Sequence, residues 1–136
     1  MKKKILIIGG TGFIGINLIK KFNLINFKIY SLSRTKPSKK NKVKLIKYLI
    51  CDLSNKKKLN KVLNKLNFNY VINLGGEINH KNRSRVYKSH YIGVKNLLEI
   101  FLKKKIEKFI QIGSSIENGN IKSPQTENFI NKSNLI

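Results

Sequence analysis

The sequence has few of the residues that define several protein classes, and each shortage excludes something. It contains a single cysteine, Cys51, so it can form no internal disulfide. No apolar run approaches the roughly 20 residues that a helix needs to cross a bilayer. The basic start is followed by only four apolar residues, 5–8, and then by glycines, which is too short for a secretion signal. We therefore expect a cytoplasmic protein that makes no use of a membrane.

Acidic residues are also scarce, since 6 stand against 29 basic residues and the net charge is +23. Such an excess is typical of nucleic-acid-binding proteins. However, the basic residues are lysines spread over the whole chain, except for Arg34, Arg83 and Arg85, and arginine is preferred for base and bidentate phosphate contacts. Lysine, asparagine and isoleucine, all abundant here, share AT-rich codons. A low-GC genome accounts for the charge, and nucleic-acid binding is the less favoured interpretation.

Short apolar runs alternate with longer amphipathic segments along the chain. The runs predict strands over residues 5–8, 28–33, 43–51, 70–74 and 109–112. Three helices are predicted between them: one with Ile14, Leu18, Phe22 and Ile25 inward, one capped by Ser54 with Leu59, Val62, Leu63 and Leu66 inward, and one with Tyr87, Tyr91, Val94, Leu98 and Phe101 inward. This alternation predicts βαβ units and a parallel sheet. The last residues, 116–136, lack a clear period, which indicates a domain cut before its end.

A glycine-rich loop lies between the first predicted strand and the first predicted helix. Gly9, Gly12 and Gly15 have the spacing GxxGxxG. Glycine permits a tight turn, allows a pyrophosphate to approach the backbone, and lets the helix pack closely on the strand. The helix N-terminus then offers free N–H groups to phosphate. The loop, with Phe13 and Ile14, is predicted to hold the pyrophosphate of NAD or NADP; a glycine-rich turn without a ligand is the alternative.

The segment Gly9-Gly-Thr-Gly-Phe-Ile-Gly15 resembles the opening of the NAD-dependent epimerase/dehydratase family, the extended short-chain dehydrogenases. Further segments resemble that family in the same order: Asp52-Leu53, Asn73-Leu-Gly-Gly76, Gly93 to Glu99, Phe109 to Ser115, and Pro124 to Glu127. The resemblance implies a doubly wound α/β (Rossmann) fold with strand order 3-2-1-4-5 and helices on both faces. It also implies that Asp52, Leu53, Leu74, Gly75 and Gly76 contact the cofactor. Because family members are longer, it implies that residues 1–136 are an incomplete NAD(P)-binding domain.

The end of the second strand favours NADP over NAD. An acidic residue about 20 positions past the glycines usually binds the ribose 2′-hydroxyl of NAD, whereas an arginine accommodates the 2′-phosphate of NADP. No Asp or Glu occurs between Ile16 and Cys51, and the strand ends in Ser33-Arg34. A hydroxyl and a guanidinium suit a phosphate dianion. The alternative is that Arg34 is only a solvated loop residue.

The family's catalytic residues are only partly present. The resemblance places on Ser114, with Ser115 as the near alternative, the residue that holds the substrate hydroxyl; both could instead merely end the strand. The family's Tyr-x-x-x-Lys pair should follow that serine, but no tyrosine occurs after Tyr91. The match from Tyr91 to Lys95 precedes the serine, and Tyr91 is expected in the core. His80 and His90 have no partners at metal-ligand spacing, so no metal site is predicted.

These observations predict the cofactor-binding N-terminal part of an NAD(P)-dependent nucleotide-sugar epimerase, dehydratase or reductase. The parent enzyme would take a nucleotide-sugar-like small molecule, and whether it forms a homodimer is left open. The chain itself would bind NADP(H) without doing chemistry, and an uncovered fifth strand would make it marginally stable alone. The alternatives are a non-catalytic NADP-sensing module and a lysine-rich nucleic-acid binder.

Overall fold

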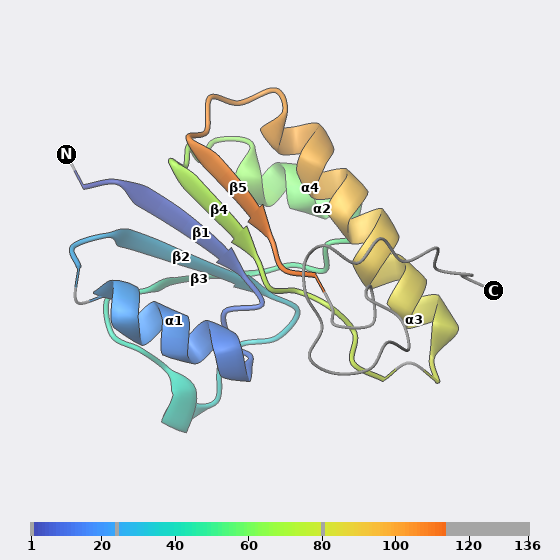
Figure 1. The fold of residues 1–136 in the computed structure, drawn as a ribbon, viewed down its shortest axis with the longest axis horizontal. Coiled ribbons are helices and arrows are strands. Elements are labelled where there is room, and N and C mark those ends of the chain that lie inside the picture. Colours follow the sequence, from blue (N-terminus) through green and yellow to red (C-terminus); the bar gives the residue numbers. More distant parts are fainter. Residues whose placement is uncertain (1, 24, 80, 114–136) are drawn as a thin grey trace, which may run out of the picture.

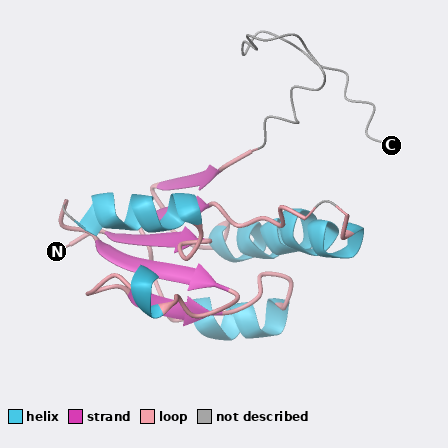
Figure 2. Cartoon of the chain, turned by 90° about the horizontal axis from the view of Figure 1, so that it is seen from below, coloured by secondary structure: helices cyan, strands magenta, loops and turns pink. Residues whose placement is uncertain are grey.

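The computed structural model describes residues 2–23, 25–79 and 81–113. Their centre is a five-stranded parallel sheet in the order β3-β2-β1-β4-β5, which confirms the predicted topology (Figure 1). The strands are β1 (Lys4–Ile8), β2 (Lys28–Ser33), β3 (Lys47–Ile50), β4 (Tyr70–Asn73) and β5 (Lys108–Gln111). All five arrows point the same way in Figure 2, so the carboxyl ends of the strands share one edge of the molecule.

Helices connect the strands and cover both faces of the sheet (Figure 1). They are α1 (Phe13–Asn23), α2 (Lys56–Leu63), α3 (Arg83–Tyr87) and α4 (Gly93–Phe101). A π-helical turn, Lys88–Ile92, joins α3 to α4, so the three segments form one continuous helix. A 3₁₀ turn, Lys39–Asn41, lies in the polar loop after β2. None of these helices, in the part of the chain that the structure covers, is long and apolar enough to cross a bilayer.

The central strand β1 supplies side chains to two separate cores. Ile5 and Ile7 point to the face covered by α1 and pack with Ile19. Leu6 and Ile8 point to the opposite face, which α2 and α4 cover. The second core also holds Tyr30, Leu32, Cys51, Leu53, Leu59, Leu63, Phe68, Val71, Leu97, Ile100 and Phe101. A strand covered on both faces must be apolar at every position, which explains the unbroken run from Ile5 to Ile8.

Three local predictions about α1, α2 and β3 were wrong in detail. Ile14 and Ile25 are 59% and 58% exposed, because Ile14 lies in the first turn of α1 beside a cleft and Ile25 lies beyond the end of the helix. The cap of α2 is Asn55, whose side chain accepts from the Lys58 N–H, and not Ser54. Strand β3 occupies only four residues of the segment predicted for it.

The buried face of the long helix differs from the predicted one. Tyr87 and Tyr91 are 57% and 53% exposed and stack on each other with ring centroids 5.2 Å apart. Leu98 is exposed as well, and of the predicted stripe only Phe101 is buried. The residues that face the sheet are Gly93, Asn96, Leu97, Ile100 and Phe101. The apolar periodicity failed because this face includes a glycine and an asparagine, while two tyrosines lie outside.

Candidate dinucleotide-binding cleft

A cleft of about 560 Å³ opens where β1, β2, β3 and β4 end. Open α/β sheets bind ligands at this edge. Every residue that the sequence predicted for the cofactor lines it: Gly9, Gly12, Phe13, Ile14, Gly15, Ser33, Arg34, Asp52, Leu53, Leu74, Gly75 and Gly76. They come from four strand ends that are far apart in the sequence, and the parallel sheet brings them together.

The glycine loop has the geometry of a backbone cradle. Gly9 has a φ of +76°, and a Cβ there would meet backbone atoms of Leu74 and Gly75 at 3.1 Å. A Cβ on Gly15 would lie 2.4 Å from the Gly9 carbonyl oxygen, so α1 packs directly on the loop. A Cβ on Gly12 would meet only that same oxygen, at 3.3 Å, and otherwise open space. Gly12 therefore leaves room on the cleft side, directly before the N-terminus of an 11-residue helix.

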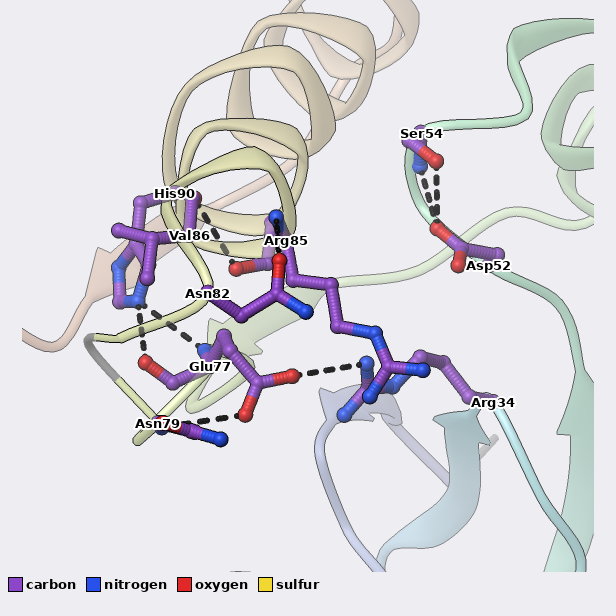
Figure 3. A network of polar contacts seen from close by, with 10 residues as sticks. Arg34, Asp52, Ser54, Glu77, Asn79, Asn82, Arg85, Val86 and His90 are labelled. Atoms are coloured by element: carbon purple, nitrogen blue, oxygen red, sulfur yellow. Dashed lines mark hydrogen bonds and ion pairs between the residues drawn. The ribbon is translucent and has the colours of Figure 1, made fainter.

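The end of β2 presents a guanidinium and a hydroxyl to the cleft. The hydroxyl of Ser33 is buried and has no hydrogen-bond partner among the residues that the structure describes. Arg34 Nη1 lies 3.2 Å from Glu77 Oε2, and the Arg34 side chain is 55% exposed (Figure 3). An unpartnered hydroxyl beside an accessible guanidinium fits an oxygen-rich group such as a ribose or a phosphate.

Glu77 is a cleft residue that the sequence reasoning missed. It is only 8% exposed, although it follows the predicted turn Gly75-Gly76 directly. Hydrogen bonds from the Asn79 N–H and from Arg34 lower the pKa of Glu77 below its usual value, so it is ionised at neutral pH. A signal was present, because Glu77 is the only acidic residue between Asp52 and Glu99 and adjoins a predicted cofactor turn.

Asp52 and Leu53 form another wall of the cleft. The N–H and the hydroxyl of Ser54 both donate to Asp52 Oδ1, at 2.8 Å each. Burial by itself raises the pKa of Asp52, but the two Ser54 hydrogen bonds together with the charges of Arg34 and Lys88 outweigh burial, and the net pKa is lowered. The backbone of Leu53 is held by α4, since its carbonyl oxygen accepts from the buried Asn96 amide at 2.8 Å. Asp52 is therefore a charged, positioned acceptor.

The π-helical turn supports the opposite wall. His90 Nε2 accepts from the Glu77 N–H at 3.0 Å. A Cβ on Gly76 would lie 2.7 Å from the His90 ring, so any larger residue at this position would have to displace that ring. The described residues contain no group of three His, Cys, Asp or Glu side chains able to hold a metal ion.

The predicted substrate-binding serine and the tyrosine of the Tyr-x-x-x-Lys match are not part of the cleft that the structure describes. Ser114 and Ser115, the candidates for the substrate-binding serine, lie outside the described residues, as does His80. Gln111, at the end of β5, is tied to the sheet by the Asn73 amide, which donates to its side-chain oxygen at 2.8 Å. Tyr91, which we expected in the core, is half exposed on the outer surface of the helix, where it stacks on Tyr87.

Comparisons with known proteins agree with this architecture. The model of the NAD dependent epimerase/dehydratase family matches residues 5–134. An ADP-L-glycero-D-manno-heptose-6-epimerase from Helicobacter pylori is 30% identical, with a TM-score of 0.80, and the match covers 93% of this chain and 44% of that one. A UDP-Glc/GlcNAc 4-epimerase from Campylobacter jejuni is 24% identical, with a TM-score of 0.81 and coverage of 91% and 41%. A uronate dehydrogenase from Agrobacterium tumefaciens, solved with NAD, is 17% identical, with a TM-score of 0.71 and coverage of 84% and 42%.

The chain thus spans less than half the length of these structures. No curated protein sequence matches it significantly. The family model nevertheless spans almost every residue, from the first strand through the glycine loop and the sheet. The chain belongs to the NAD dependent epimerase/dehydratase family.

Proposed function

We propose that this chain is the dinucleotide-binding part of an enzyme that acts on a nucleotide sugar, and that its cofactor is NADP(H) rather than NAD(H). The observation that carries the proposal is the cleft itself, which gathers the glycine loop, Ser33-Arg34, Asp52-Leu53 and the Leu74–Gly76 turn around one space. Family membership indicates a nicotinamide dinucleotide. The nucleotide-sugar class is supported by similarity to epimerases whose names contain UDP-glucose.

Each wall of the cleft has a role in this proposal. The N–H groups at the start of α1, behind Gly12, would bind the pyrophosphate. Ser33 and Arg34 would bind the phosphorylated ribose, and Asp52 with Leu53 would contact the adenine. The Leu74–Gly76 turn would contact the rest of the dinucleotide. The bound dinucleotide would supply a hydride acceptor or donor, while Ser114 stays the candidate for holding a substrate hydroxyl.

Dissociation constants for NADPH and NADH test the cofactor assignment. We expect NADPH to bind more tightly than NADH, since a charge-assisted hydrogen bond is stronger than a neutral one. Arg34→Ala should raise the dissociation constant for NADPH about tenfold and leave that for NADH nearly unchanged, because only NADPH has the 2′-phosphate. Arg83→Ala, which removes an arginine of α3 that does not line the cleft, is the matched control. Tighter binding of NADH, or an unaltered preference in Arg34→Ala, would refute the assignment.

A binding assay with nucleotide sugars tests the substrate class. The expected result is binding of a UDP-sugar or ADP-sugar in the presence of the dinucleotide, and loss of that binding in Ser114→Ala. The NADP-sensing and nucleic-acid alternatives stay predictions. Binding to DNA that falls steeply with salt and is insensitive to NADPH would favour the second of them.

A further inference from the structure

The guanidinium proposed for the 2′-phosphate is already engaged by a carboxylate. Arg34 Nη1 and Glu77 Oε2 are 3.2 Å apart, and both residues line the cleft. Arg34 follows β2 and Glu77 follows β4, so the ion pair connects two strand ends across the cleft (Figure 3). An incoming phosphate at Arg34 must therefore compete with a group that belongs to the protein.

The two partners are held very differently. Glu77 is 8% exposed, its Oε1 accepts from the Asn79 N–H at 3.2 Å, and its own N–H donates to His90 Nε2 at 3.0 Å. The Arg34 side chain is 55% exposed, and its only hydrogen bond within the described part of the chain is the one to Glu77. The carboxylate is therefore the fixed partner, and the long arginine side chain is the one that can move.

A second carboxylate, Asp52, lies within electrostatic range of Arg34. Arg34 acts electrostatically on Asp52 as well as on Glu77. Arg85, extending from α3 toward the same carboxylate in Figure 3, acts on Glu77, and Lys88 acts on Asp52. A phosphate dianion that reaches Arg34 has to displace one fixed carboxylate and approach a second, whereas a ribose hydroxyl carries no charge and meets neither penalty.

We propose that Glu77 sets the dinucleotide preference of this protein by acting as an internal competitor for Arg34. The inference rests on the proposed cofactor site and adds to it a specificity-determining residue. Glu77 weakens NADP(H) binding selectively, because only the 2′-phosphate needs the guanidinium edge that Glu77 occupies. Glu77 thereby reduces, without reversing, the preference for NADPH over NADH that Ser33 and Arg34 create.

The test is Glu77→Gln, which keeps the size of the side chain and one acceptor oxygen for the Asn79 N–H but removes the charge and replaces the other oxygen by an amide donor. The dissociation constant for NADPH should fall about threefold to tenfold, the range of a partly exposed ion pair plus a removed repulsion. The constant for NADH should change by less than about twofold. In the double variant Arg34→Ala/Glu77→Gln the tighter binding of NADPH should disappear, because there is no longer a guanidinium for which Glu77 could compete.

Glu99→Gln is the matched control, because Glu99 pairs with Lys56 at 2.6 Å and is absent from the cleft lining. It should leave both constants unchanged. If Glu77→Gln does not fold, Glu77→Asp replaces it: the shorter side chain draws the carboxylate away from Arg34 and weakens the ion pair, so a smaller decrease in the dissociation constant for NADPH is expected.

The outcomes separate the two proposals. If the wild-type protein binds neither dinucleotide, the proposed function fails. If it binds NADPH through Arg34 but removal of the Glu77 contact leaves the NADPH constant unchanged, or tightens NADPH and NADH equally, only the competitor role is overturned.

Discussion

Gly12 and Gly15 belong to the same loop, yet the structure predicts opposite consequences for alanine at each. A Cβ on Gly12 has one near neighbour, the Gly9 carbonyl oxygen at 3.3 Å, and the backbone there is not left-handed. Alanine at such a position stabilises a fold by about 0.4–1 kcal/mol through the unfolded chain, and the one tight contact offsets part of this. The free energy of unfolding of Gly12→Ala should therefore stay within about 1 kcal/mol of wild type.

Binding should respond in the opposite way. The added methyl group projects into the space that the pyrophosphate needs, so the dissociation constants for NADPH and NADH should both rise about tenfold or more. In Gly15→Ala the new Cβ would lie 2.4 Å from the Gly9 oxygen and 2.5 Å from the Gly10 Cα. Because the backbone of the loop has to move, the free energy of unfolding of Gly15→Ala should fall by about 1–3 kcal/mol.

Urea unfolding followed by circular dichroism measures the stabilities, and titration calorimetry measures binding on the same samples. A folded Gly12→Ala protein that binds NADPH as tightly as wild type would refute the close approach of a pyrophosphate to this loop. A Gly15→Ala protein as stable as wild type would refute the packing of α1 on the loop.

Two further predictions concern stability alone. Asn96→Ala should lower the free energy of unfolding by about 1–3 kcal/mol, measured by urea unfolding, because the buried Leu53 carbonyl oxygen loses its donor. Glu107→Gln should change the pH dependence of stability. Hydrogen bonds from Lys3, Tyr70 and Asn69 hold the pKa of Glu107 at about 2, against 4.5 without them. The folded protein therefore binds fewer protons at this site than the unfolded chain, and the stabilisation is complete above about pH 5 and lost as the pH falls toward 2. The difference in stability between wild type and Glu107→Gln, from urea unfolding at several pH values, should shrink over that window.

The Asn96 prediction has a matched control variant, and both stability predictions have an outcome that would contradict them. Asn60→Ala, on the exposed side of α2, should leave stability nearly unchanged, and an equal effect at both asparagines would contradict the role of the buried amide. For Glu107, a difference that stays constant between pH 2 and 7 would show that the carboxylate makes no favourable contact in the folded protein.

The local features of this protein were predictable because they depend on neighbours in the chain. A strand covered on both faces has to be apolar throughout, so Ile5–Ile8 was recognisable, and a loop against a phosphate has to consist largely of glycine. The order of the strands was predicted from the resemblance to the epimerase/dehydratase family, which the glycine loop first indicated. The face of the long helix was mispredicted since Asn96, a polar residue, is buried by its bond to the Leu53 carbonyl, while Tyr87 and Tyr91 lie outside.

The sequence by itself determined the strands and the glycine cradle, because hydrophobic period and backbone freedom are properties of each residue and its neighbours, and the family resemblance added most of the residues predicted to contact the cofactor. Only the tertiary structure decided what those residues meet. Arg34 and Glu77 are 43 positions apart, and they pair because parallel strands β2 and β4 both end at the same edge. The contact of His90 with the Glu77 backbone depends instead on how the π-helical turn packs against the segment that follows β4. The glycine loop thus identifies a dinucleotide site, whereas the charge that surrounds Arg34, and with it the proposed choice of dinucleotide, depends on contacts that no local pattern contains.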